Sequence, residues 1–351
     1  MLTKLRSTKI WMQRWLDPTR IALVAASLVA LPACTSVKVK LGMRVYLAQT
    51  PVASMEARLP KGPGMAPGQK SPLVVTVTEP DGTVLLTEGQ GGGKVMWKDL
   101  TVTARVVTVN EKGVVSLSKD PRVSDGKVGH VSIAAPSHPD VKAAELDIPF
   151  RYDVSFAANF AGSKGSDGMN GTDGMDGASG SMGSTDPNNP SAGGDGGNGT
   201  DGGNGGDGGS GGDAPPVEVR MALQAPTQST LPSGSHPLLQ VSVTAAGHQK
   251  LFLVDPQGGS LTVKADGGDG GSGGRGGRGG RGGSGGMGTP SGSNGRDGMD
   301  GRNGSDGLEG RGGLITVTYD PQAKPYLSAL HVSSRNGPKP VFREGAVAAL
   351  W

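Results

Sequence analysis

The side chains that most often carry catalysis are few in this chain and do not cluster. Its 351 residues include one cysteine, Cys34, so no cysteine pair exists. None of the five histidines lies in a G-x-S-x-G, H-E-x-x-H or H-x-E setting. They are scattered along the chain: His130, His138, His236, His248 and His331. No nucleophile with a neighbouring base is predicted, so we expect a protein that is not an enzyme and needs no cofactor.

Acidic side chains at a repeated position are the next candidates. Four of them recur every six residues: Asp195, Asp201, Asp207 and Asp213. On a helix with three residues per turn this spacing places them on one face. We favour a solvated acidic stripe, and the alternatives are divalent cations or pairing with a basic stripe. Three arginines with period three supply such a stripe: Arg275, Arg278 and Arg281.

Two short motifs resemble known binding sequences but lack a defining feature. Residues 196–201 (GGNGTD) match the opening of the calcium-binding nonapeptide of parallel β-rolls, but Gly203 replaces its large apolar residue and the motif does not recur. Residues 274–283 (GRGGRGGRGG) resemble RNA-binding RGG segments, but the run has no aromatic residue on which a base could stack. We therefore predict no metal site and no nucleic acid partner.

Composition and charge agree with this. Aromatic residues make up 4% of the chain and hydrophobic residues 34%, which is low for a globular protein of this length. Residues 1–33 hold five Lys and Arg side chains and one Asp, so the rest of the chain carries 29 basic and 30 acidic side chains. That balance argues against broad binding to nucleic acid.

Glycine at every third residue is the dominant pattern of the sequence. It forms four runs of nearly equal length, which we call glycine segments 1 to 4: residues 162–183, 193–213, 267–288 and 292–313. The phase breaks across 184–192 (STDPNNPSA) and is reset at 289–291 (TPS). Proline, which stiffens collagen chains, is absent from all four segments.

Three structures can follow from this period. A collagen-like trimer places glycine at the crowded axis of three chains. Flexible Gly-rich linkers have no fixed conformation. The third is one chain folded back as a bundle of four antiparallel polyglycine II rods, each a left-handed helix with three residues per turn. Matched lengths and turn-like breaks favour the rods, and with them a monomer. Because such a helix has no internal hydrogen bonds, its N–H and C=O groups must pair with neighbouring rods.

The triplets also differ between segments. Segments 2 and 3 are mostly Gly-Gly-X, which leaves two faces of a rod bare, whereas segments 1 and 4 are Gly-X-Y, which leaves one face bare. We expect segments 2 and 3 in the middle of the bundle and segments 1 and 4 at its margins. If each pair is an antiparallel hairpin, the breaks at 184–192 and 289–291 lie together at the end remote from the β domains.

The rest of the sequence predicts a mostly β protein. Residues 34–160 contain short apolar runs separated by polar turns, at 73–79, 84–86, 95–97, 100–109, 114–117, 130–134 and 144–156. This spacing is typical of a β-sandwich, and the domain resembles in outline the immunoglobulin-like modules of bacterial surface proteins.

A second, smaller β domain is expected from two separated parts of the chain. Residues 214–266 form an insert between the glycine segments of 162–213 and those of 267–313, and residues 314–351 follow the last one. Up to six strands are predicted there: 217–223, 239–243, 251–254, 261–263, 315–319 and 326–332.

The first 33 residues are predicted to be a signal peptide. Basic residues precede an apolar run at 21–31, which is too short to cross a bilayer as a helix. The sequence Leu31-Pro32-Ala33-Cys34 resembles the lipobox of bacterial lipoproteins. The resemblance implies cleavage before Cys34, a thioether-linked diacylglycerol and a third acyl chain on the new amino group, which together anchor firmly. Thr35 in place of an aspartate favours the outer membrane. The alternative is an ordinary signal peptide with a leftover thiol.

Taken together, the lipobox and the Gly-x-x runs resemble collagen-like, glycine-rich lipoproteins of Gram-negative envelopes. The resemblance implies attachment to the membrane through acylated Cys34 and no defined activity. We expect a structural or adhesive envelope lipoprotein that presents a glycine-rod projection and contacts a protein or a surface glycan through turns 184–192 and 289–291. The alternative is a periplasmic accessory lipoprotein that binds a protein complex through its β domains.

Overall fold

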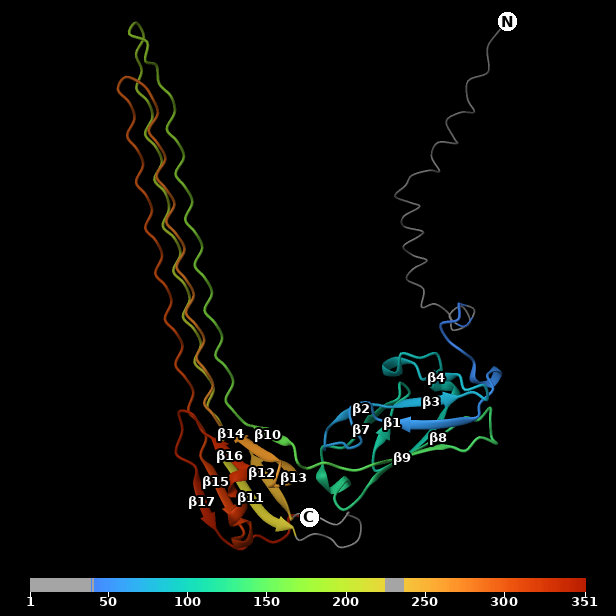
Figure 1. Ribbon diagram of the computed structural model, residues 1–351. Coiled ribbons are helices and arrows are strands. Elements are labelled where there is room, and N and C mark those ends of the chain that lie inside the picture. The colour runs from blue at the N-terminus through green and yellow to red at the C-terminus, as the bar shows by residue number, and fades with distance from the viewer. Residues whose placement is uncertain (1–38, 40, 225–236) are drawn as a thin grey trace, which may run out of the picture. The chain divides into compact units, whose positions relative to one another are not determined.

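The computed structural model describes residue 39, residues 41–224 and residues 237–351 (Figure 1). Cys34, the predicted signal peptide and His236 lie outside these residues. The described chain is mostly β, with its strands in five sheets and short 3-10 helices between them. Within it, no helix is long and apolar enough to cross a membrane. The chain divides into two compact units: residues up to Leu117 with Val128–Phe150, and Ser118–Lys127 with Arg151–Trp351.

The first unit contains three sheets of three strands, all with antiparallel pairing. One sheet joins β1 (Ser54–Arg58), β3 (Val74–Thr78) and β4 (Val84–Leu86). The next joins β2 (Lys70–Pro72), β7 (Val114–Ser116) and β6 (Thr108–Val109). The last joins β5 (Thr101–Arg105), β8 (Gly129–Ala134) and β9 (Ala144–Ile148).

These sheets enclose one hydrophobic core. The core forms because alternate residues of a strand point to the same side of its sheet. In β8 buried residues alternate with half-buried ones, and Val131 and Ile133 are fully buried. The strand predicted at 100–109 is interrupted at Val106, whose φ of 68° is rare for a β-branched residue. It therefore becomes β5 and β6, which belong to different sheets. The strand predicted at 95–97 is a single bridge residue, Val95, followed shortly by a 3-10 helix, η3 (Trp97–Asp99).

The second unit contains two sheets. The larger has the order β13 (His248–Val254), β12 (Leu238–Ala245), β11 (Val217–Gln224), β15 (Ile315–Tyr319) and β17 (Val341–Glu344). The smaller has the order β10 (Ser155–Asn159), β14 (Ser260–Lys264) and β16 (Leu330–Ser333). Side chains from both sheets form one core, including Ala158, Leu261, Val263, Val219, Val241 and Val317.

The boundary between the β domains lies earlier than the predicted residue 160. Strand β10 pairs with β14 and so belongs to the second unit. The segment Ser118–Lys127 also joins that unit, because Asp125 accepts hydrogen bonds from Gln224 Nε2 at 3.1 Å and Trp351 Nε1 at 2.8 Å. Tyr152 OH donates to Ser124 Oγ at 3.0 Å, and burial raises the pKa of Tyr152 to about 12, which keeps this donor protonated.

Two further details of the second unit differ from the prediction. Most of the strand expected at 326–332 is a 3-10 helix, η5 (Pro321–Ala329), which begins where the Asp320 side chain accepts from the N–H of Gln322 at 2.9 Å. Strand β17 was not predicted, and all four of its residues are exposed, so it has no alternating apolar pattern.

The two cores allow a test of the division into units. Ile133→Ala removes a fully buried side chain and should lower the free energy of unfolding of the first unit by about 2–5 kcal/mol. Val84→Ala, at a side chain that is 57% exposed, should change it by less than about 0.5 kcal/mol. In scanning calorimetry the Ile133→Ala shift should be confined to one of two transitions; an equal shift of both would contradict separate cores.

Candidate functional site

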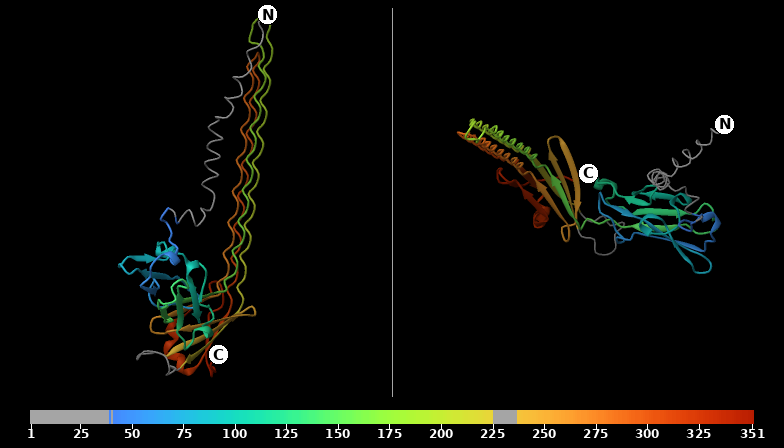
Figure 2. Two further views of the ribbon diagram at one scale, coloured as in Figure 1. Left: turned by 90° about the vertical axis from the view of Figure 1, so that its right-hand side faces the viewer. Right: turned by 90° about the horizontal axis from the view of Figure 1, so that it is seen from above.

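The four glycine segments are hydrogen bonded to one another and lie side by side (Figure 2). Segment 1 runs antiparallel to segment 2, where Gly197 N–H donates to Ala178 C=O at 2.7 Å. It runs parallel to segment 3, where Gly165 N–H donates to Asp269 C=O at 2.8 Å. Three further pairs of segments are joined by hydrogen bonds that repeat every three residues. Between segments 2 and 4, Gly196 N–H donates to Ser293 C=O. Segment 3 bonds to both segment 4, where Gly295 N–H donates to Gly283 C=O, and segment 2, where Gly271 N–H donates to Gly209 C=O.

Segments 2 and 3 therefore have three hydrogen-bonded neighbours each, and segments 1 and 4 have two. The Gly-Gly-X segments are the ones with three neighbours. In segment 3 one glycine of every triplet, from Gly268 to Gly286, is buried. Because glycine has no side chain, these positions let three neighbouring backbones approach at once.

The strands of the second unit continue into the glycine segments with the same register. Strand β10 precedes segment 1 and β14 precedes segment 3, and these strands pair in parallel with Ser155 opposite Ser260. The same separation of 105 residues relates Asp167 to Ser272 within the segments. Likewise β11 and β15 pair in parallel after segments 2 and 4, with Glu218 opposite Thr316. Pairing in the sheets thus sets the register of the segments.

Backbone approach is closest at the buried glycines. A Cβ added to Gly274 would lie 1.9 Å from the carbonyl oxygen of Met169, far inside van der Waals contact. Gly206, at the same level in segment 2, is different, because its Cβ would lie 3.3 Å from the backbone nitrogen of Met169. A side chain is in fact present at the equivalent position Thr200. Packing therefore requires glycine at buried positions such as Gly274, but not at positions such as Gly206.

Aspartate and asparagine side chains provide a second set of hydrogen bonds, from Oδ1 to backbone N–H groups of a neighbouring segment. In segment 2, Asp201 accepts from Met299 N–H and Asn198 from Arg296 N–H, both at 2.8 Å. Asp and Asn thus make the same contact through a side-chain oxygen that both residue types have. The sequence analysis did not predict this role, although Asp and Asn alternate at one triplet position.

The same hydrogen bond, from a backbone N–H group to an Asp or Asn side chain, recurs along three of the grooves between neighbouring segments. Acceptors on segment 2 serve segment 4: Asp195, Asn198, Asp201, Asn204, Asp207 and Asp213. Acceptors on segment 1 serve segment 3: Asp167, Asn170, Asp173 and Asp176. Acceptors on segment 4 also serve segment 3: Asn294, Asp297, Asp300, Asn303 and Asp306. Along most of segment 3, all three N–H groups of a triplet are consequently satisfied.

This arrangement corrects the interpretation of the aspartates at 195, 201, 207 and 213. They are exposed, but they bind backbone N–H groups of segment 4 rather than forming a merely solvated stripe. The alternative, pairing with Arg275, Arg278 and Arg281, does not occur among the described residues. These arginines form no ion pair in that part of the chain, whereas Lys164 pairs with Asp167 and Arg335 with Asp269. No group of three or more His, Cys, Asp or Glu side chains in the described chain could hold a metal ion.

Hydrogen bonding lowers the pKa of several of these carboxyl groups. Contacts from the Ser293 hydroxyl and N–H lower the pKa of Asp195. The Ser305 N–H and hydroxyl do the same for Asp207. In Asp167 the largest cause of the lowered pKa is the N–H of Ser272, followed by Lys164. The ionised carboxylate is the better acceptor in each case.

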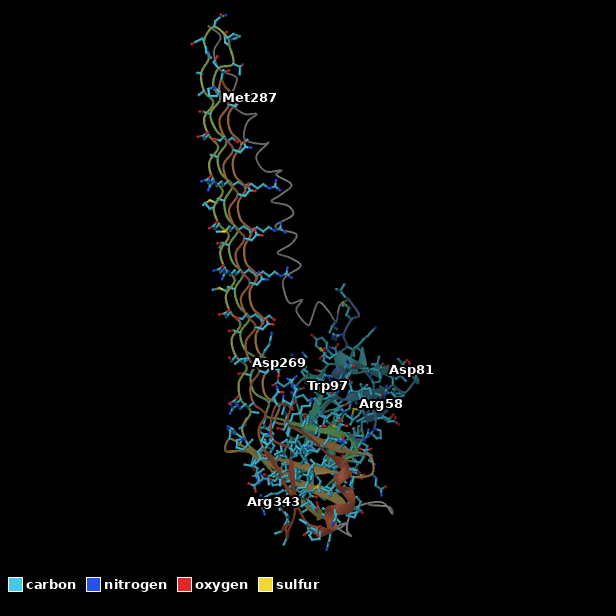
Figure 3. The ribbon with its side chains drawn as sticks, turned by 90° about the vertical axis from the view of Figure 1, so that its left-hand side faces the viewer. Arg58, Asp81, Trp97, Asp269, Met287 and Arg343 are labelled. Carbon is cyan, nitrogen blue, oxygen red and sulfur yellow. The ribbon has the colours of Figure 1, made fainter. Side chains whose placement is uncertain are left out.

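The turns 184–192 and 289–291 connect the segments at the end remote from the two sheets of the second unit (Figure 1). Figure 3 marks this direction, with Asp269 near the sheets and Met287 near the turns. The turns contact each other, because Thr289 N–H donates to Ser191 C=O and Gly193 N–H to Pro290 C=O, both at 2.9 Å. Their side chains are exposed. Two loops far apart in the sequence therefore form one exposed polar tip.

The first unit holds a separate pocket of about 580 Å³, whose lining includes Trp97, Leu100 and Val109. Trp97 is 6% exposed, and its Nε1 is a buried donor without a partner. Of the described histidines, only His130 forms ion pairs, with Glu145 and Asp147 on the neighbouring strand. Its pKa is raised chiefly by the hydrogen bond to Asp147.

Comparison with known proteins adds no relative: neither protein-family models nor curated protein sequences match this chain.

A matched pair of substitutions tests the packing of the glycine segments. Gly274→Ala should destabilise them by about 1–3 kcal/mol, because the added carbon overlaps the Met169 carbonyl. Gly206→Ala, at the same level, should leave their stability within about 0.5 kcal/mol of the parent. Thermal unfolding followed by circular dichroism measures both. Equal effects of the two substitutions would contradict the packing.

Acidification tests the side-chain hydrogen bonds. A lowered pKa in the folded state means that these carboxylates stabilise the fold above pH 3.8, the ordinary value for aspartate, and that this contribution is lost as the pH falls through the lowered value. The combined variant Asp167→Asn, Asp195→Asn, Asp207→Asn keeps the acceptor oxygens and should lose this part of the acid sensitivity.

The matched control replaces the same three residues with alanine. It should destabilise the segments at pH 7 by more than the asparagine variant does, because the alanine variant loses the acceptor oxygen as well as the charge. Urea unfolding at pH 7 and pH 3 measures the difference. Equal stability of the Asn and Ala variants at pH 7 would exclude the acceptor role.

Proposed function

We propose that the chain is an envelope lipoprotein that presents a projection of four polyglycine II rods, built on an immunoglobulin-like β-sandwich and a second β domain. The observation that carries the proposal is the hydrogen bonding of the glycine segments to one another every three residues. The period matches the three residues per turn of this helix. Each rod spans roughly 65 Å at about 3.1 Å per residue, so the tip is held far from the sheets of the second unit.

Membrane attachment is proposed from the sequence around Cys34. The lipobox-like Leu31–Cys34 follows an apolar run, which supports acylation of this cysteine, and Thr35 in place of an aspartate supports an outer-membrane location. Attachment would hold the amino-terminal end of the mature chain at a lipid surface. A structural or adhesive role needs this combination of a firm anchor and a regular spacer.

Contact with a partner is proposed at the tip formed by residues 184–192 and 289–291. Support comes from its exposure and from its own hydrogen bonds, such as Asn188 N–H to the Asp186 side chain at 2.9 Å, which hold the loop in one conformation. A preorganised loop loses less entropy on binding than a flexible one. Its polar side chains suit a protein or a surface glycan.

The second candidate is a periplasmic accessory lipoprotein that binds a protein complex through its β domains. The observation that favours it is the pocket beside Trp97, whose lining combines apolar side chains such as Leu100 with the charged Arg44 and Glu88. Under this proposal the glycine rods are a spacer and the first β domain makes the contact.

Replacing both turns of the tip with Gly-Ser linkers of equal length tests the leading proposal. Binding of the purified full chain to the cell surface should fall to the background level, while export and the circular dichroism spectrum of the segments stay unchanged. The control replaces turn 80–82 of the first unit in the same way and should leave binding intact. Protease treatment of intact cells separates the two candidates, because digestion of the tip requires surface exposure. Unchanged binding after the turn replacement refutes the tip assignment.

A further inference from the structure

One groove of the four glycine segments differs from the others. Asp and Asn side chains fill the grooves between segments 1 and 3, 2 and 4, and 3 and 4. The groove between segments 1 and 2 has no such row. We call the surface along it the segment 1–2 face, which comprises Ser163, Ser166, Met169, Thr172, Met175, Ala178 and Ser181 of segment 1 with Gly194, Gly197, Thr200, Gly203, Gly206, Gly209 and Gly212 of segment 2.

The side chains of segment 1 border this groove. The hydroxyl oxygens of Ser166 and Thr172 lie 2.7 and 3.0 Å from the positions that a Cβ of Gly209 and of Gly203 would occupy. Met169 and Met175 stand at the same triplet position as these residues, and their side chains are 83% and 75% exposed. The face is therefore a regular row of hydroxyl and apolar side chains beside bare glycine.

Backbone donors along the face have no acceptor in the described chain, with one exception. Met175 N–H donates to Thr200 Oγ1 at 2.7 Å. The equivalent N–H groups of six residues make no hydrogen bond: Ser163, Ser166, Met169, Thr172, Ala178 and Ser181. They differ from Met175 because segment 2 carries glycine opposite them and so supplies no side-chain oxygen. Asp and Asn side chains accept hydrogen bonds from N–H groups along the other three grooves, whereas Thr200 is the one side chain that does so along the groove between segments 1 and 2.

Charge separates this face from the remaining sides. The segment 1–2 face has no charged residue. Every other side has charged side chains, such as Asp173 and Arg278 between segments 1 and 3, or Asp201 and Arg302 between segments 2 and 4. Burying such a side in an interface removes charged groups from water, which is costly unless each charge finds a partner. The uncharged face can meet a copy of itself without this penalty.

We propose that two copies of this chain associate side by side through their segment 1–2 faces. The hydroxyl groups of one copy then act as acceptors for the open N–H groups of the other, as Thr200 does for Met175 within one chain. A strip roughly 60 Å long and two chains, or about 10 Å, wide buries on the order of 600 Å² per copy, close to that of a small specific interface. The inference goes beyond the proposed function, because it depends on the paired segments and not on the anchor or the tip.

Site-specific cross-linking of the full chain tests this pairing. Thr172 lies midway along segment 1, so two-fold pairing with full overlap of the faces, parallel or antiparallel, brings the two copies of Thr172 to the same level. Under oxidation with copper phenanthroline, Thr172→Cys should give a disulfide-linked dimer in several-fold greater yield than Ser272→Cys, an exposed control on segment 3. The unchanged chain measures any contribution of Cys34.

Introduced charge gives the second measurement. The double variant Ser166→Lys, Ser181→Lys places like charges on both faces and should weaken self-association in sedimentation velocity by about tenfold or more. The control Ser272→Lys, Ser284→Lys on segment 3 should leave it unchanged, and circular dichroism should show that both variants keep their fold. Equal cross-linking at 172 and 272, a monomeric unchanged chain, or a cross-linked product containing a different protein would each overturn the proposal.

Discussion

The structure of the glycine segments depends on one constraint: backbone groups that have no partner within their own helix and are buried between segments must find partners in neighbouring segments. Ordering glycine is costly in conformational entropy, at roughly 1–2 kcal/mol per residue or more. Two sources of acceptors meet the requirement here: carbonyl groups such as that of Gly209, and side-chain oxygens such as that of Asp167. Glycine is needed where three backbones meet, and Asp or Asn where a groove opens to water.

A repetitive sequence can form this arrangement only if the register between its segments is fixed. A run of identical triplets can slide by three residues without changing its own contacts. The β-strands of the second unit remove that freedom, because β10 and β14 carry distinct side chains, bury Ala158 and Val263 in a shared core, and continue directly into segments 1 and 3. The sheet is therefore more than a base for the segments, since its core fixes which triplet faces which.

Much of the secondary structure follows from local sequence, and the rest does not. Strands such as Val84–Leu86 and Ile315–Tyr319 could be predicted because their apolar residues alternate or cluster between turn residues. The interruption at Val106 could not, since tertiary packing holds a valine at a φ that its side chain disfavours. Alternation of Asp and Asn in segment 2 was visible, but its meaning depends on N–H groups 98 residues away, and only the parallel pairing of β11 with β15 defines that distance.

Amide hydrogen exchange, resolved residue by residue, tests the central claim most directly. Through the middle of segment 3, all three amides of each triplet donate hydrogen bonds, so continuous protection is predicted around Gly276, Gly277 and Arg278. In segment 1 only the glycine of each triplet donates, with Met175 as the exception, so protection should recur every third residue from Gly165. Fast exchange throughout both segments, or protection without this difference between them, would contradict the account.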